Sequence, residues 1–208
     1  MSGQPTIHYH IGDLPEGVSF GDAIAIDTET QGLNLQRDRL CVVQLSAGDG
    51  SAHLVHFPKA DYAAPNLKKA LVAEGVTKIF HYARFDVAAL QQYLGVMCQP
   101  VFCTKIASKL TRTYTDRHGL KDLCRELLGI ELSKEQQSSD WAASELSDAQ
   151  RAYAASDVLY LHRLRDELVK RLEREQRTSL AEACFAFLPA RAGLDLTGWE
   201  DLDIFAHS

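Results

Sequence analysis

The sequence predicts an α/β fold in which helices flank a mixed central β-sheet. Short strand-like segments dominate the first half of the 208-residue chain, and longer helix-like segments dominate the second half. Three consecutive strand-like segments are separated only by short polar or glycine-rich breaks, which favours an antiparallel meander in the sheet. The composition, with 46% hydrophobic and 24% charged residues, is typical of one globular domain that buries a sizeable core.

The predicted strands are short runs rich in aliphatic and β-branched residues. They are TIHYHI (6–11), AIAIDTE (23–29), LCVVQLSA (40–47), AHLVHF (52–57) and the shorter KIFHY (78–82). The turn sequence GDGS separates the third run from the fourth.

The predicted helices follow in the chain. They cover about 66–73, then RFDVAALQQYL (84–94), CTKIASKL (103–110), GLKDLCRELLG (119–129) and one long helix from about 147 to 173. Ser147 with Gln150 is typical of a capping box, so it predicts the start of the long helix.

Charge and targeting signals limit the classes of function. The net charge is −6 and the pI is about 5.7, which argues against non-specific binding of long nucleic acid. No run of 18 apolar residues predicts a membrane helix, and the N-terminal segment lacks the pattern of a secretory signal. The five cysteines include no CxxC pair. We therefore expect a cytoplasmic protein without disulfides and without a membrane partner.

Two carboxylates end the second predicted strand. Asp27 and Glu29 are two residues apart and so point to the same face of a strand. Like charges held side by side resist ionisation unless a cation lies between them. A DxE sequence at the end of a strand is equally consistent with a surface turn.

Three further residues are candidates for the same site. On the predicted long helix, Tyr153 and Asp157 share a face with apolar residues that we expect in the core, namely Leu161, Leu164 and Leu168. A carboxylate on such a face is normally paired or bound to a metal. Asp86 begins an apolar helix, where it is also explained as an acid that complements the helix dipole.

Together these segments resemble a known family. DTET (27–30), Asp86 and YAASD (153–157) resemble the three motifs of the DEDD exonucleases, and Tyr153, four residues before Asp157, resembles the DEDDy branch. The sister branch has a histidine where this chain has Ala152. Residues 120–161 resemble ribonuclease D, including Asp140 and Trp141, and the resemblance extends from about 23 to 168. It implies a ribonuclease H-like exonuclease fold.

The chain also departs from ribonuclease D. It has Ser144-Glu145-Leu146 where those relatives usually have Arg-Pro-Leu, and only 40 residues follow Leu168, so we expect no C-terminal RNA-binding domains. This pattern is similar to the small nanoRNase C (NrnC) type, which acts on dinucleotides. We expect one exonuclease domain over 1–208, with its motif core at about 23–168 and a C-terminal helix and apolar tail at 174–208.

The resemblance implies a reaction and a set of roles. Two Mg²⁺ ions, for which Mn²⁺ can substitute, would be held by Asp27, Glu29, Asp86 and Asp157. Asp27 would bridge both ions, Glu29 and Asp157 would complete the first, and Asp86 would support the second through water. Tyr153 would orient the attacking water, and the products would be nucleoside 5′-monophosphates. Small residues at Ala23 and Ala25 would leave room for the helix that brings Asp157 close.

The remaining candidates concern the substrate. Thr30, Leu33, His81 and Arg84 are expected to bind it, and Leu33 matches the position at which relatives wedge an apolar side chain between the last two bases. Each has an ordinary alternative: Leu33 in the core, His81 in a structural role and Arg84, like Lys105, at the solvated surface. The spacing of the histidines and cysteines predicts no zinc site.

We carry three hypotheses of function. The first is a metal-dependent 3′→5′ exoribonuclease acting on short single-stranded RNA, dinucleotides above all. The alternatives within the enzyme class are ribonuclease D-type trimming of longer RNA and 3′→5′ exonuclease activity on DNA; the alternative outside it is a catalytically silent binding domain. The apolar residues after 193 either pack on their own domain or contact another subunit, and the nanoRNase C type implies a homo-oligomer, an octamer.

Overall fold

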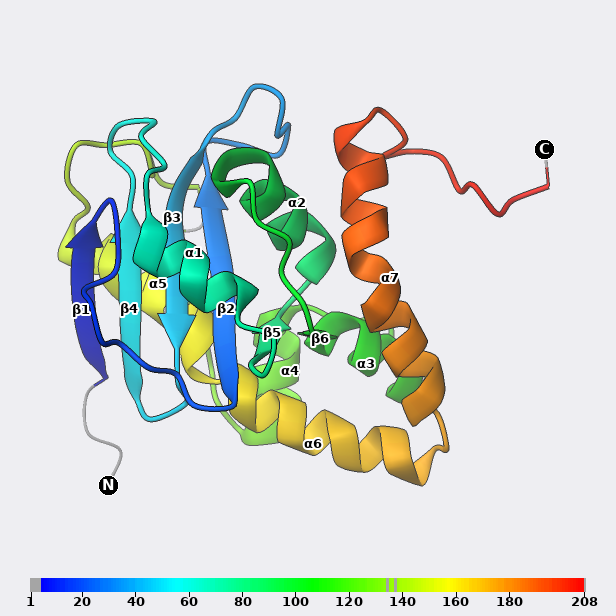
Figure 1. The fold of residues 1–208 in the computed structure, drawn as a ribbon. Helices are drawn as coiled ribbons and strands as arrows, with labels where there is room; N and C mark the ends of the chain where they lie inside the picture. The colour runs from blue at the N-terminus through cyan, green and yellow to red at the C-terminus, as the bar shows by residue number, and fades with distance from the viewer. Residues whose placement is uncertain (1–4, 134, 137, 208) are drawn as a thin grey trace.

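Six strands form one mixed sheet in the computed structural model, which describes residues 5–133, 135–136 and 138–207. Their order across the sheet is β1–β4–β3–β2–β5–β6 (Figure 1). The strands are β1 (Thr6–Ile11), β2 (Ala23–Thr30), β3 (Leu40–Ser46), β4 (Ser51–His56), β5 (Thr77–Phe80) and β6 (Val101–Cys103). This arrangement confirms the predicted α/β fold.

The pairing of the strands confirms the meander. β2 pairs antiparallel with β3, and β3 pairs antiparallel with β4. The other pairs, β1 with β4, β2 with β5 and β5 with β6, are parallel. Strand β6 was not predicted, because three residues are too few to show alternation; the structure corrects the start of the helix predicted at 103 accordingly.

Helices cover both faces of the sheet. In Figure 1, α5 lies behind β2, β3 and β4, whereas α1 and α2 lie in front. The helices are α1 (Pro65–Val72), α2 (Ala83–Leu94), α3 (Thr104–Thr111), α4 (Leu120–Leu123), the π-helical turn η1 (Cys124–Leu128), α5 (Asp148–Leu159), α6 (Leu161–Arg174) and α7 (Thr178–Leu196). Ser147 caps α5 through the predicted capping box with Gln150. Within the described residues, every helix is too short or too polar to cross a bilayer.

The prediction of one long helix from about 147 to 173 is wrong, because the structure has two helices, α5 and α6, in this range. They meet at Tyr160, where the backbone has φ −110° and ψ −3°, and α6 leaves in a new direction to pack against α3. Leu161, Leu164 and Leu168 are buried on α6 rather than on the helix that carries Asp157. Neither glycine nor proline marks the break, so nothing local in the sequence reveals it.

Small side chains allow α5 to approach the sheet closely. Ala23 and Ala25 of β2 and Ala154 and Ala155 of α5 are buried. Because a methyl group is the only side chain at these positions, the helix backbone can lie close to the strand. The acids at the end of β2 and on α5 are thereby brought toward one place.

The C-terminal segment packs only in part. Helix α7 lies against α2 and β6. The tail that follows leaves Trp199, Leu202, Ile204 and Phe205 exposed, although the Phe205 ring lies 5.8 Å from that of Phe187. Leu196 packs against the core, and the backbone of Glu200 accepts hydrogen bonds from Arg84 and Arg191. Packing on the tail's own domain, the first predicted alternative, therefore describes only part of the segment. Contact with a second subunit stays a prediction.

Candidate active site

An open cleft of about 710 Å³ lies where β2 ends, between the first turn of α2 and α5. All five residues that the sequence singled out for catalysis line this cleft. They are Asp27, Glu29, Asp86, Tyr153 and Asp157. They come from three elements that are far apart in the sequence, so the fold alone brings them together.

Three of the carboxylates form a compact cluster. Asp27 and Glu29 project from the same face of β2, and Asp157 comes from α5. One ligand oxygen from each lies within 4.8 Å of the others. The register of β2 against β3 shifts between Glu29 and Thr30, so the strand leaves regular pairing just after the second acid.

The fourth carboxylate is the most buried. Asp86 is 4% exposed and lies in the first turn of α2. Its Oδ1 accepts a hydrogen bond of 2.7 Å from the Thr28 hydroxyl, whose residue lies between the two acids of β2. This contact fixes Asp86 beside the cluster, so a role limited to the helix dipole does not describe it.

Burial and mutual repulsion oppose ionisation of these acids. Desolvation raises the pKa of Asp27 to about 7 and, together with repulsion from Asp27, Asp157 and Asp86, raises the pKa of Glu29 to about 10. Desolvation and the Asp27 charge also raise the pKa values of Asp86 and Asp157. No lysine or arginine among the described residues forms an ion pair with any of the four.

The donor set therefore fits hard divalent cations. Several carboxylate oxygens converge on one place, and none of these acids has an ion-pair partner among the described residues. Mg²⁺ prefers such oxygen ligands and commonly binds through a few carboxylates together with water. A cation would also offset the desolvation and the mutual repulsion that raise the pKa values of these acids.

Tyr153 lies one helical turn before Asp157. Desolvation and the charges of Asp157, Glu29 and Asp27 raise the pKa of its hydroxyl above the ordinary value of 10.0. The ring lies 6.1 Å from that of Trp141, which is buried in the wall of the cleft. The phenol therefore stays protonated at neutral pH and can donate a hydrogen bond, but it is a poor base.

Three of the four residues expected to bind substrate also line the cleft. They are Thr30, Leu33 and His81. Leu33 is 85% exposed, so the alternative that it is a core leucine is wrong. His81 Nδ1 lies 2.9 Å from the Thr104 hydroxyl, and burial lowers the pKa of His81 to about 3, so its ring is neutral.

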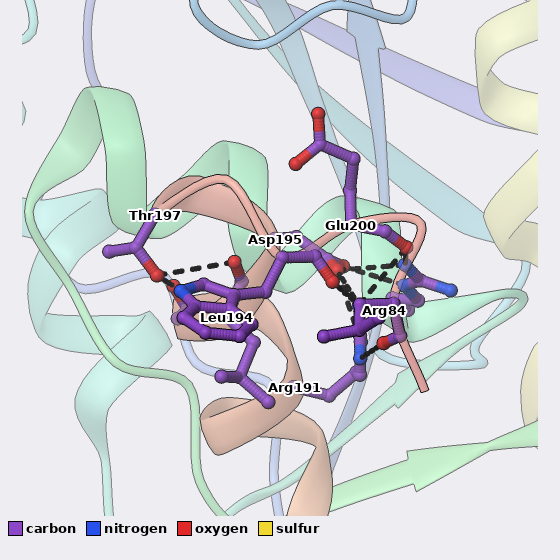
Figure 2. Close-up of polar contacts among 9 residues, drawn as sticks. Arg84, Arg191, Leu194, Asp195, Thr197 and Glu200 are labelled. Atoms are coloured by element: carbon purple, nitrogen blue, oxygen red, sulfur yellow. Dashed lines mark hydrogen bonds and ion pairs between the residues drawn. The ribbon is translucent and has the colours of Figure 1, made fainter. Parts of the chain in front are cut away.

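Arg84, the fourth, does not line the cleft. Figure 2 shows its guanidinium directed at Asp195 of α7 and at the backbone of Glu200. Its Nε and Nη2 donate bonds of 2.6 and 2.8 Å to the Asp195 carboxylate, which also accepts from Arg191. The expected contact with substrate is not supported by this position, because a partner 111 residues away occupies the side chain.

Sequence reasoning missed several residues of the site. Gln44 is fully buried on β3 opposite Asp27, with Nε2 3.4 Å from Oδ2 of that acid. Tyr82 lines the cleft in a left-handed conformation, φ 69°, and Lys105 Nζ lies 4.2 Å from its ring centroid. The strand register alone places Gln44 there. The segment KIFHY (78–82) predicts a strand that includes Tyr82, so the sequence gives no sign of the left-handed conformation at this residue.

Comparisons with known proteins agree with this geometry. Residues 12–173 match the model of a family described as 3′-5′ exonuclease. The chain is 62% identical to NrnC of Brucella melitensis bound to pGG, with a TM-score of 0.95 over 98% of this chain and 100% of that one. The structure of the same protein with bound Mg²⁺ gives 61% identity and a TM-score of 0.94 over 98% and 100% of the two chains.

A curated relative is longer. Ribonuclease D of Granulibacter bethesdensis is 35% identical over 187 residues, which are 86% of this chain and 46% of that protein. The chain thus spans about half the length of the curated relatives that it matches first.

Proposed function

The chain belongs to the 3′-5′ exonuclease family, in its ribonuclease D-like, NrnC-type branch, and from this premise we propose that it removes nucleotides from the 3′ ends of short RNA. Dinucleotides are the preferred substrate in this proposal, and the products are nucleoside 5′-monophosphates. The observation that carries it is the cluster of Asp27, Glu29 and Asp157, three carboxylates within reach of one cation, beside a cleft open to solvent.

Two Mg²⁺ ions would be held by the four carboxylates, with Asp27 between them. When bound, such ions stabilise the charge that develops on the scissile phosphate and on the leaving oxygen. Glu29 and Asp157 would complete one position, while Asp86, held by Thr28, would support the other through water. The match to a Brucella protein with bound Mg²⁺ supports this assignment.

Tyr153 would orient the attacking water. Its hydroxyl is protonated at neutral pH, since its pKa lies above 10, so it donates a hydrogen bond and does not remove the proton. A hydrogen bond that fixes the water in line with the phosphorus favours attack by positioning. This role needs only the hydroxyl group, so phenylalanine is the informative replacement.

The walls of the cleft suit a short strand. Leu33 presents an almost fully exposed apolar side chain at the rim, which a base can stack upon, and neutral His81 adds a hydrogen-bonding ring. The net charge of −6 disfavours tracking along a long polyanion. The Brucella relative is bound to pGG, which supports a short substrate for this chain.

The test compares substrates of different length and sugar. We would incubate the protein with 5′-labelled RNA of two and seven nucleotides, and with matching single- and double-stranded DNA, in Mg²⁺ or in EDTA. We expect rapid cleavage of the dinucleotide in Mg²⁺ and none in EDTA. Comparable rates on the seven-nucleotide RNA would favour ribonuclease D-type trimming, and faster cleavage of DNA would favour a DNA exonuclease.

Variants of the acids separate catalysis from binding. Asp157→Ala should abolish hydrolysis while the protein still folds, because the residue lies at the cleft and outside the apolar core. Asp22→Asn, at an exposed carboxylate just before β2, is the matched control and should keep full activity. Activity retained by Asp157→Ala would overturn the assignment, and a wild-type protein that binds RNA without cleaving it would favour the silent binding domain.

A further inference from the structure

Three histidines gather on the outer strands of the sheet, away from the acids. His8 and His10 are two residues apart on β1 and so share a face. Strand β1 is parallel to β4, and the register places His8 opposite His53. The imidazoles of His8, His10 and His53 therefore occupy one patch, which we call the histidine cluster.

The rings are close and nearly parallel. His10 Nε2 lies 3.0 Å from His53 Nδ1. The centroid of His53 lies 4.7 Å from that of His8 and 5.2 Å from that of His10, with interplanar angles of 25° and 17°. Two ring nitrogens from different strands thus already face each other, and a third ring is stacked beside them.

The cluster lies on the opposite face of the sheet from the acids. The register aligns Asp27 with Gln44, Gln44 with Leu54, and Leu54 with Tyr9, so these four share a face. This is the face that α5 covers, as the Arg151 guanidinium 4.0 Å from the Tyr9 ring centroid shows. Residues adjacent to Tyr9 in β1 point the other way. The histidine cluster is therefore a separate place and no extension of the active site.

The imidazoles are in the form that binds transition metals. Burial and the neighbouring His8 lower the pKa of His10, and burial with both neighbours lowers the pKa of His53 to about 4. Both rings are then neutral at pH 7, and a neutral imidazole can bind a metal ion without first losing a proton.

The spacing of His10 and His53 also suits one ion. With bonds of roughly 2.0–2.1 Å, two nitrogen ligands of a tetrahedral zinc ion lie about 3.3–3.4 Å apart. The 3.0 Å between His10 Nε2 and His53 Nδ1 is a hydrogen bond, so one of these two nitrogens carries a proton. For both to bind an ion, that proton would move to the other nitrogen of its ring and the separation would widen by a few tenths of an ångström. The His8 ring stacks on that of His53, and the ring nitrogens of the three histidines do not all lie within 4.8 Å of one another. Because His8 is exposed, a change of its rotamer would bring a nitrogen to the same point.

We propose that His8, His10 and His53 bind one imidazole-preferring transition-metal ion, of which Zn²⁺ is the example. Such an ion differs in kind from Mg²⁺, which takes oxygen ligands. It would join β1, an edge strand of the sheet, to its neighbour β4 and so hold the strand in place. The sequence predicted no zinc site, because one of the three ligands comes from a different strand, 43 residues from His10.

The test is calorimetric titration of the untagged protein with Zn²⁺ in excess Mg²⁺, which competes with Zn²⁺ for the carboxylates. We expect one equivalent of Zn²⁺ to bind, and His10→Asn or His53→Asn to weaken binding by about tenfold or more. His8→Asn changes an exposed residue, so it folds normally and should weaken binding as well. His207→Asn, in the exposed tail, is the matched control and should bind like the wild type.

A second measurement guards against misfolded variants. Zn²⁺ should raise the melting temperature of the wild type and of His207→Asn, and raise it less in His8→Asn. The proposal is overturned if the wild type binds no Zn²⁺, or if all three cluster variants bind it as tightly as the control. It is also overturned if Zn²⁺ binding is lost in Asp27→Asn and kept in the cluster variants, since the ion would then occupy the carboxylates.

Discussion

Replacing Asp27 with asparagine should stabilise the metal-free protein at pH 8. In the wild type, burial raises the pKa of Asp27 from 3.8 to about 7. At pH values between these two, Asp27 keeps its proton in the folded state and has released it in the unfolded state. Between about pH 4 and pH 7 the folded state therefore binds more protons than the unfolded state, and the free energy of unfolding falls as the pH rises. Above pH 7 the full loss is present. The amide of asparagine carries no charge at any of these pH values, so Asp27→Asn does not lose this part of the free energy of unfolding.

The size of the effect follows from the two pKa values. The difference between 3.8 and about 7 corresponds to about 4 kcal/mol, at roughly 1.4 kcal/mol for each pKa unit. Because the cleft is open to solvent, we expect roughly 2–4 kcal/mol of extra stability in Asp27→Asn at pH 8. In a chain of this length, that is a rise of roughly 4–16 °C in melting temperature. At pH 4 the two proteins should melt within a few degrees of each other.

The assay is thermal and urea denaturation in EDTA at pH 4, 5, 6, 7 and 8. Asp22→Asn, which removes an exposed carboxylate, controls for the general effect of net charge. Adding Mg²⁺ should raise the stability of the wild type at pH 8 and have little effect on Asp27→Asn, which lacks the proposed bridging ligand. Parallel pH profiles for the wild type and Asp27→Asn in EDTA would refute the reasoning, because burial would then not raise the pKa of Asp27 in the folded state.

Three further results are expected. Tyr153→Phe should lower kcat by about tenfold or more and leave the Mg²⁺-dependent rise in melting temperature intact; an unchanged kcat removes its role in orienting water. Leu33→Ala should change the free energy of unfolding by less than about 0.5 kcal/mol, since the side chain is 85% exposed, yet raise KM for a dinucleotide; an unchanged KM contradicts stacking on the base. Asp195→Asn should lower the free energy of unfolding by about 1–3 kcal/mol, because both Arg84 and Arg191 lose charge-assisted bonds to this carboxylate, whereas Asp203→Asn should have a smaller effect; equal losses would argue against a stabilising role for these two contacts.

The acids can be predicted from the sequence, whereas the histidine cluster cannot. The acids are recognisable because three local settings, each weak by itself, occur together and in the order of the DEDD motifs: two acids at a strand end, one in the first turn of a helix, and one after a tyrosine at helical spacing. His8, His10 and His53 have no such setting, since alternation within β1 pairs the first two and only the register with β4 adds the third.

Local pattern by itself determined the five longer strands, most helix positions, the capping box at Ser147 and the candidate acids, because these depend on neighbours within a few residues. The tertiary structure alone decided what depends on distant partners. The turn at Tyr160 follows from packing α6 on α3, and Gln44 stands behind Asp27 because of strand register. Arg84 is directed to Asp195 rather than into the cleft because α7 packs against α2. The sequence specifies the type and the spacing of the side chains, whereas the packing of the helices and strands determines which side chains come into contact.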